Sequence, residues 1–278
     1  MAISAFVHRL ALGTALAAGT LAAAPSAHAG EAVNILVLKE NGVGSAAQAQ
    51  GFIDRLMAQA AKVNGWAAAA GKYATTRTAA EGYIHESHPN YGFISLAAFL
   101  GLRGRHQLEV IGKIEVAQAG GRQYHVVSGK HGDVAGCKGK TLATNHGDDS
   151  RFIDNVVFGG AFKLADFEIV STRRPLQTIK KVASGEAECA LIDEAQLEAM
   201  KGMDDAKGVK AVWDSKMLPP MVAVAFPTAS AEEKRGFKAN LTKVCAGDGA
   251  SACKEAGIKA MSQATEKDYS AVISAYGK

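Results

Sequence analysis

Two histidines in the segment His85-Glu86-Ser87-His88 have a spacing that could serve metal binding. On a helix, residues three positions apart lie on one face, so both imidazoles would point the same way. The segment is one residue short of H-E-x-x-H and therefore does not predict zinc-protease chemistry. A zinc site would need a further ligand, for which His146 is available. Surface histidines near a helix end are the alternative, and we predict no metal site.

The segment Gly42-Val43-Gly44-Ser45-Ala46-Ala47 fits the dinucleotide pattern G-x-G-x-x-A after an apolar run. The pattern also needs an acidic residue after the second strand of the unit, where Thr75 and Thr76 stand. We therefore expect no cofactor, and a helix N-terminus beside a cleft is a better role for these glycines. No G-x-S-x-G segment is present, so the nucleophile of a hydrolase is not indicated either.

Four cysteines form an even set, which is typical of exported proteins with disulfides. Cys245 and Cys253 bracket a short loop that suits a local disulfide. Cys137 and Cys189 each precede an apolar run, and a bond there would join neighbouring strands at their starts. Metal ligation is the alternative, but no C-x-x-C spacing supports it. We predict disulfides and no catalytic thiol.

The first 29 residues have the pattern of a secretory signal peptide. Arg9 precedes an apolar, alanine-rich run from Leu10 to Ala24, and Ala27-His28-Ala29 is an A-x-A cleavage signal. A buried N-terminal helix is the alternative, but it gives the cleavage triplet no role. We expect a mature chain that begins near Gly30 and works in the periplasm, where nucleotide-dependent chemistry is not expected.

The mature chain has about 249 residues, enough for one large or two modest domains. Without Arg9 it carries 30 Lys and Arg residues against 27 Asp and Glu, a net charge of +3. The lysines are scattered rather than clustered, which indicates a solvated surface. We therefore expect no nucleic acid partner.

Strand-like and helix-like runs alternate along the mature chain, a pattern typical of α/β proteins with parallel sheets. Strands are predicted at Asn34–Leu38, Gly71–Thr76, Tyr91–Ser95, Leu108–Ala117, Tyr124–Ser128, Lys140–Thr144, Phe167–Ser171, Cys189–Asp193, Val209–Trp213 and Met221–Phe226. Helices are predicted at Ala46–Val63, Thr78–His85, Leu96–Leu102, Arg151–Phe162, Leu176–Ala183, Ala231–Cys245 and Glu266–Tyr276.

The pattern restarts near residue 130 and returns after Pro219-Pro220. We therefore expect the chain to leave one lobe, build a second and come back, with two hinge crossings and a cleft between the lobes. The predicted parts are a signal peptide at 1–29, a first lobe at 30–128 plus 216–278, and a second lobe at 129–215. Each lobe is expected to be a mainly parallel sheet flanked by helices.

Four segments resemble type II periplasmic solute-binding proteins. Gly139–Ala143 (GKTLA) is similar to the opening of their second lobe, and Ser184–Asp193 (SGEAECALID) resembles a strand entry in that lobe. Tyr91–Ser95 is similar to a strand that ends in a ligand-facing serine, and Leu218–Val224 to the return strand. The nearest resemblance is to the phosphate/phosphite/phosphonate-binding components of ABC importers. It implies a two-lobed type II fold that closes on a ligand about a hinge.

In open α/β sheets a ligand lies beyond the carboxyl ends of the strands. The resemblance and this rule together place ten candidate residues around the cleft: Lys39, Asn41, Ser95, Thr144, Asn145, His146, Asp149, Ser150, Arg173 and Asp193. The resemblance further implies that Asp193 holds a ligand amine. Glu194 is expected to begin the next helix, where the helix dipole favours an acid.

The segment His146–Ser150 departs from the family pattern, in which a Ser/Thr-rich loop holds an anion. Asp148 and Asp149 would repel an oxyanion in a closed, water-poor cleft. A role as a helix cap is the alternative, because Asp and Ser are favoured there. A neutral, cationic or largely apolar ligand therefore fits better than phosphate or phosphonate, although Arg173 or Lys39 could still receive a carboxylate.

We expect a monomeric solute-binding protein rather than an enzyme. It captures a small organic ligand between the lobes and delivers it to a membrane transporter of the ABC-importer type. The alternatives are a carrier of lipid-like cargo with the same fold, and a ligand-presenting partner of a membrane sensor.

Overall fold

The computed structural model describes residues 32–40, 46–117 and 120–278. The predicted signal peptide, Asn41 and residues 42–45 of the glycine-rich segment lie outside this range. Within the described residues no helix is both long and apolar enough to cross a membrane.

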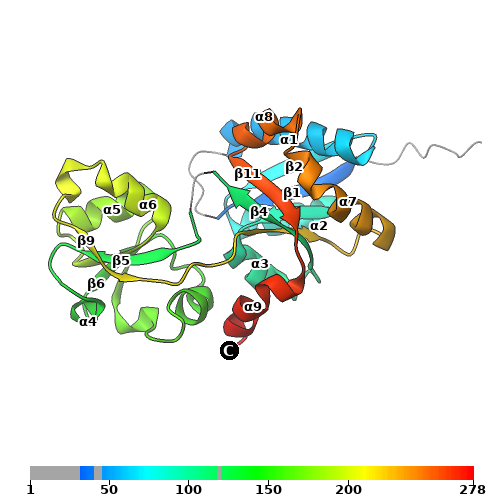
Figure 1. Cartoon of the computed structure of the whole chain (residues 1–278). Helices are drawn as coiled ribbons and strands as arrows, with labels where there is room; N and C mark the ends of the chain where they lie inside the picture. Colours follow the sequence, from blue (N-terminus) through cyan, green and yellow to red (C-terminus); the bar gives the residue numbers. More distant parts are fainter. Residues whose placement is uncertain (1–31, 41–45, 118–119) are drawn as a thin grey trace, which may run out of the picture.

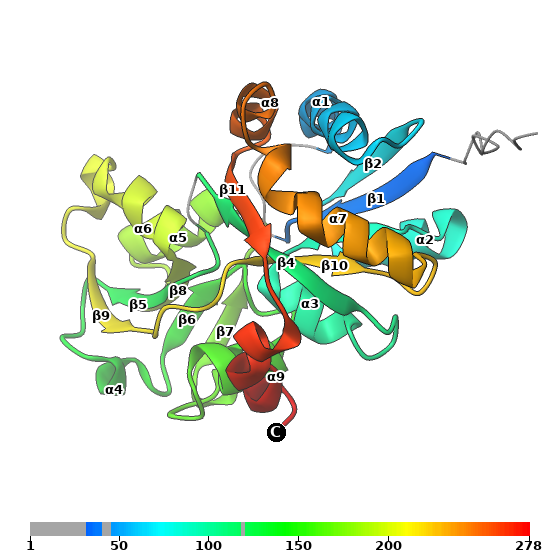
Figure 2. The same ribbon diagram turned by 45° about the vertical axis from the view of Figure 1, so that its right-hand side comes forward.

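Two sheets form the frame of the molecule, each with helices on its faces (Figures 1 and 2). The first sheet has the order β11-β4-β10-β3-β1-β2. Its strands are β1 (Val33–Leu38), β2 (Ala69–Ala74), β3 (Tyr91–Ile94), β4 (Glu109–Val116), β10 (Met221–Ala225) and β11 (Ile258–Gln263). The second sheet has the order β7-β6-β8-β5-β9. Its strands are β5 (Tyr124–Ser128), β6 (Thr141–Thr144), β7 (Glu168–Ser171), β8 (Cys189–Asp193) and β9 (Lys210–Asp214).

Helices follow most strands, as the alternating pattern predicted. The α-helices are α1 (Ala46–Asn64), α2 (Arg77–Ser87), α3 (Leu96–Leu102), α4 (Val134–Cys137), α5 (Pro175–Ala183), α6 (Glu194–Lys201), α7 (Ala231–Val244), α8 (Gly249–Glu255) and α9 (Ser270–Tyr276). Short 3-10 helices are η2 (Leu164–Asp166), η3 (Asp204–Ala206) and η4 (Glu266–Tyr269), and η1 (Phe152–Val157) is a π-helix.

Strand β1 shows how the sequence builds the first lobe. Its side chains alternate between the two faces of the sheet. Ile35 and Val37 join the core cluster that includes residues of α1 and α7, whereas Leu36 and Leu38 join the cluster of α2 and α3. A strand buried on both faces needs a continuous apolar run, which is what β1 has.

Parallel pairing is limited to one half of each sheet. In the first sheet β1 pairs in parallel with β2 and β3, and in the second β6 pairs in parallel with β7 and β8. β10 and β5 are antiparallel to both of their neighbours. These are the first strands after each crossing between the sheets. The two-sheet α/β architecture is confirmed, but the prediction of mainly parallel sheets is wrong, because three of the five strand pairs described in the first sheet and two of the four in the second are antiparallel. Antiparallel pairs form around the strands that enter from the other lobe.

The division of the chain differs from the predicted one at residue 128. β5 belongs to the second sheet, so the first crossing precedes Tyr124. The polar segment 129–132, the predicted boundary between the lobes, instead leads from β5 to α4 within the second lobe. The two crossing segments lie side by side, since Leu218 N–H donates to Arg122 O (2.7 Å) and Ser215 N–H to Tyr124 O (2.8 Å). They connect the two sheets at the position expected for a hinge.

Other local elements also differ from the predictions, whereas the disulfides do not. The helix expected at 151–162 is a short helical turn that runs into η1. The strand β11 and the helix α8 were not predicted. Both disulfides are confirmed, Cys137–Cys189 within the second lobe and Cys245–Cys253 beside α8.

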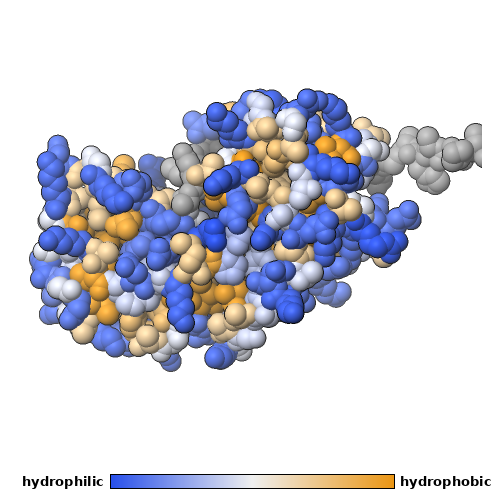
Figure 3. All heavy atoms as spheres, in the orientation of Figure 1, coloured by the Kyte–Doolittle hydropathy of each residue, from blue (hydrophilic) through white to orange (hydrophobic). Residues whose placement is uncertain are grey.

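One apolar cluster runs through both lobes. It joins Phe99 of α3 and Val272 of α9 to Phe152 and Val156 of η1. The surface drawn in Figure 3 is mostly polar, with smaller apolar patches over both lobes. The lobes therefore meet through an apolar contact as well as through the charged residues described next.

Candidate functional site

The candidate residues at the carboxyl ends of the strands meet between the lobes. Lys39 and Glu40 follow β1, and Ser95 follows β3, on the side of the first lobe. Asp149 precedes the helical turn after β6, and Asp193 ends β8, on the side of the second. This is the arrangement that open α/β sheets use for ligand sites.

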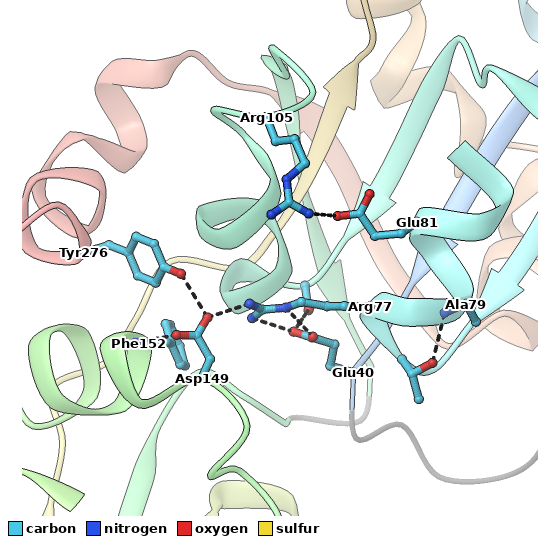
Figure 4. Close-up of polar contacts among 10 residues, drawn as sticks. Glu40, Arg77, Ala79, Glu81, Arg105, Asp149, Phe152 and Tyr276 are labelled. Carbon is cyan, nitrogen blue, oxygen red and sulfur yellow. Dashed lines mark hydrogen bonds and ion pairs between the residues drawn. The ribbon is translucent and has the colours of Figure 1, made fainter. Parts of the chain in front are cut away.

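Arg77, the first residue of α2, connects the two lobes (Figure 4). Its Nε donates to Glu40 Oε1 at 2.6 Å and its Nη2 to Glu40 Oε2 at 3.3 Å. Its Nη1 lies 2.7 Å from Asp149 Oδ2, across the gap between the lobes. Burial would lower the pKa of Arg77, but the bonds and charges of the two carboxylates outweigh it and raise the pKa above its usual range. The guanidinium therefore stays charged.

Asp149 has three partners that fix its carboxylate. Phe152 N–H donates to Oδ1 at 2.9 Å, which caps the helical turn, and Tyr276 Oη donates to Oδ2 at 3.1 Å (Figure 4). Asp149 is thus both a helix cap and an interlobe contact. Asp148 is exposed, so water screens its charge. The expected repulsion of an anion by two bare carboxylates is therefore reduced, because one carboxylate is paired and the other is in solvent.

Two opposing effects act on the pKa of the Glu40 carboxyl. Burial raises the pKa of its carboxyl, and the hydrogen bond and charge of Arg77 oppose that rise. Ser95 Oγ donates a long hydrogen bond of 3.4 Å to Glu40 Oε2. The end of β1 and the end of β3 are joined in this way around one carboxylate.

Lys39 lies within the electrostatic influence of the acids at the end of β8. Burial lowers the pKa of its amine, and the charges of Asp193 and Glu194 oppose that decrease. Asp193 accepts from Gln196 N–H at 2.9 Å as the cap of α6, and Glu194 begins that helix as expected. The first lobe thus presents cations, Lys39 and Arg77, to carboxylates of the second lobe.

Three of the predicted residues form a buried network within the second lobe. Thr144 Oγ1 donates to Leu191 O (3.1 Å) and accepts from His146 N–H (3.0 Å). Asn145 Oδ1 accepts from Gln196 Nε2 (2.9 Å), and the Gln196 Oε1 lies 2.7 Å from His146 Nε2. His146 also packs edge-on against the ring of Tyr124 at 5.2 Å. The network joins the end of β6 to α6 within the second lobe.

Of the remaining predicted residues, Ser150 and Arg173 are exposed. Asn41 lies outside the described residues. His85 is exposed on α2, and His88 is exposed as the C-cap that ends this helix in a left-handed conformation. The described part of the chain holds no group of three or more residues arranged for a metal ion.

Arg77 and Tyr276 were not among the predicted site residues. Arg77 follows β2, so the rule that ligand sites lie at strand ends could have found it. Tyr276 is near the C-terminus, and only the packing of α9 against η1 brings it to Asp149. No local pattern in the sequence indicates that contact.

Comparison with known proteins gives one family match and structures of the same fold. Residues 153–269 match a family model described as ABC transporter, phosphonate, periplasmic substrate-binding protein. No curated protein matches the chain in sequence.

Solved structures with the same fold include three bacterial proteins. A binding protein component of an ABC phosphonate transporter from Pseudomonas aeruginosa is 13% identical, with 85% of this chain and 82% of that chain covered and a TM-score of 0.62. A Xanthomonas citri protein bound to chloride is 11% identical, with 88% and 97% covered and a TM-score of 0.70. A Prochlorococcus marinus protein in complex with methylphosphonate is 10% identical, with 87% and 95% covered and a TM-score of 0.63.

At these identities the structures establish the fold, and the family model adds a sequence match over most of the second lobe and the return. The chain therefore has the two-lobed fold of type II periplasmic solute-binding proteins and resembles the phosphonate-binding components of ABC transporters.

Proposed function

We propose that this protein captures a small organic solute between its lobes in the periplasm and delivers it to a membrane transporter of the ABC-importer type. The observation that carries the proposal is the meeting of strand ends from both sheets. Lys39, Glu40 and Ser95 of the first lobe face Asp149 and Asp193 of the second. The match to a periplasmic substrate-binding family supports the same role.

The charges between the lobes bear on the class of solute. Arg77 is already shared by Glu40 and Asp149, and Lys39 lies near Asp193 and Glu194. A phosphonate dianion would have to compete with these carboxylates for the two cations. In a poorly hydrated cleft, like charges repel strongly. We therefore propose a neutral, zwitterionic or cationic organic solute.

The proposed role needs no chemical step. The solute is bound by closure of the lobes about the crossing segments, and the closed surface is what a permease reads. In this role the protein acts as a monomer with a small molecule and a membrane transporter as its partners.

Native mass spectrometry of the protein purified from its own periplasm tests the proposal. We expect one small molecule of unaltered mass per chain. A bound lipid would favour the cargo-carrier alternative, and a solute chemically converted on incubation would contradict a role limited to binding.

Calorimetry with phosphate, phosphite and methylphosphonate tests the charge argument separately. We expect no binding of these anions at micromolar concentration, because the cations between the lobes are matched by carboxylates. Micromolar affinity for any of them would show that this argument is wrong, while leaving the transport role intact.

A further inference from the structure

We propose that Arg77 is a built-in cationic bridge that holds the two lobes together without a solute. Its side chain binds Glu40 of its own lobe and Asp149 of the other, so one cation is shared by carboxylates of both lobes. This inference concerns the ligand-free protein and does not depend on which solute is carried.

The geometry of the bridge is that of a shared guanidinium. Arg77 uses Nε and Nη2 on Glu40, at 2.6 and 3.3 Å, and keeps Nη1 for Asp149 at 2.7 Å. The planar guanidinium presents its donors in a fixed fork, which suits two carboxylates at once. Glu40 therefore orients the cation from its own side, and Asp149 completes the contact from the other lobe.

The position of the bridge protects it from solvent. The side chains of Arg77, Glu40 and Asp149 are 29%, 19% and 12% exposed. Partly buried ion pairs are screened by salt much less than exposed ones. The other oxygen of the Asp149 carboxylate accepts from Phe152 N–H within the second lobe, and Tyr276 Oη of α9 donates to the same oxygen as Arg77.

Gly101 of α3 provides the room for the guanidinium. A Cβ built on Gly101 would lie 2.5 Å from Arg77 Nη1 and 3.0 Å from Arg77 Cζ. A Cβ at this position would require the guanidinium to shift from the place where it meets its partners. The close approach of Arg77 thus gives a reason for a glycine in the last turn of α3.

A second pair of opposite charges acts in the same direction. Lys39 of the first lobe lies within the electrostatic influence of Asp193 and Glu194 of the second. Both cations belong to one lobe and their interlobe partners to the other, so the charges favour closure by themselves. A ligand shifts the equilibrium between open and closed forms only by binding one form more tightly than the other. Here the charges of the chain itself contribute part of the preference for the closed form.

Small-angle X-ray scattering of the mature, ligand-stripped protein tests the bridge. We expect the radius of gyration of Arg77→Ala to exceed that of the wild type. Addition of millimolar guanidinium chloride, far below denaturing concentrations, is expected to return the Arg77→Ala value to that of the wild type, because the free cation can replace the missing side chain. Urea, a neutral molecule of the same shape, and sodium chloride at the same ionic strength are expected to have no such effect.

Arg105→Ala is the matched control, because Arg105 pairs with Glu81 within the first lobe and does not touch the second. Its radius of gyration should equal that of the wild type. Equal values for Arg77→Ala and wild type would overturn the proposal. Expansion that guanidinium fails to reverse, in a variant that still unfolds cooperatively, would also overturn it.

Gly101→Ala provides a second test that keeps every charge. Alanine favours the helical conformation of α3 over glycine, so general loss of stability is not expected. We expect expansion similar to that of Arg77→Ala, without rescue by guanidinium, since the Arg77 side chain is still present. A Gly101→Ala protein as compact as the wild type would contradict the role assigned to Gly101, which is to leave room for the Arg77 guanidinium.

Discussion

At the scale of single residues, Glu40 links the chemistry of the site to pH. Its carboxyl is buried beside Arg77, near Ser95 and within the influence of Asp149. Burial raises its pKa above 4.5, and the Arg77 hydrogen bond opposes but does not cancel the increase. A carboxyl with a raised pKa in the folded state binds more protons there than in the unfolded state. Its contribution to the free energy of unfolding therefore falls as pH rises from 4.5 through the folded-state pKa.

We expect Glu40→Gln to lack this component. Urea unfolding of both proteins from pH 4.5 toward neutrality measures it as the difference between the two slopes, which removes the contributions of other groups. The wild type should lose more stability than Glu40→Gln across that range. Parallel curves, or a wild type that gains stability relative to the variant, would show that Glu40 is not desolvated in the folded protein.

Asp149 has two roles, as a helix cap and as the charged partner of Arg77, and two substitutions can separate them. Asn caps helices about as well as Asp, so Asp149→Asn keeps the bond from Phe152 N–H but loses the charge facing Arg77. Asp149→Ala loses both. We expect Asp149→Ala to be less stable than Asp149→Asn by about 1 kcal/mol in urea unfolding. Equal stability of the two variants would mean that the cap contributes nothing.

At the scale of elements, the two disulfides should differ in their effect on stability. Cys137–Cys189 closes a loop with a sequence separation of 52, and Cys245–Cys253 one of 8. A crosslink that closes a longer loop removes more entropy from the unfolded chain. We expect Cys137→Ser/Cys189→Ser to cost about 1.5 kcal/mol more than Cys245→Ser/Cys253→Ser. A larger loss for the short loop, measured by denaturant unfolding, would contradict this ranking.

Individual elements were largely predictable, and their partners were not. The bounds of α3, β5 and β8 match the expected segments, because apolar runs of strand length and capping residues are local signals. β5 was assigned to the wrong lobe, since an apolar strand carries no mark of the sheet it joins. β11 was missed because it is half exposed and contains Lys259 and Ser262 among its apolar residues.

At the scale of the whole molecule, the sequence predicted a site at the strand ends but not the contacts that join the two lobes there. Lys39, Ser95 and Asp193 lie at or directly after strand ends, and their place in a solute site stays a prediction. The contact of Arg77 with Asp149 depends on how the lobes meet, which is a property of the assembled fold. The role of each predicted residue toward a solute stays a prediction.

Solute capture between the lobes is the central claim, and comparison of two variants by native mass spectrometry tests it most directly. Lys39→Met removes the half-buried ammonium whose attraction to Asp193 and Glu194 favours closure of the lobes, and retention of a solute depends on that closure. Glu198→Ala changes an exposed residue of α6. With wild type, Lys39→Met and Glu198→Ala all purified from the same periplasm, we predict one small molecule on the wild type and on Glu198→Ala, and a clearly lower occupancy on Lys39→Met. A small molecule retained equally by all three proteins, or absent from the wild type, would contradict the account.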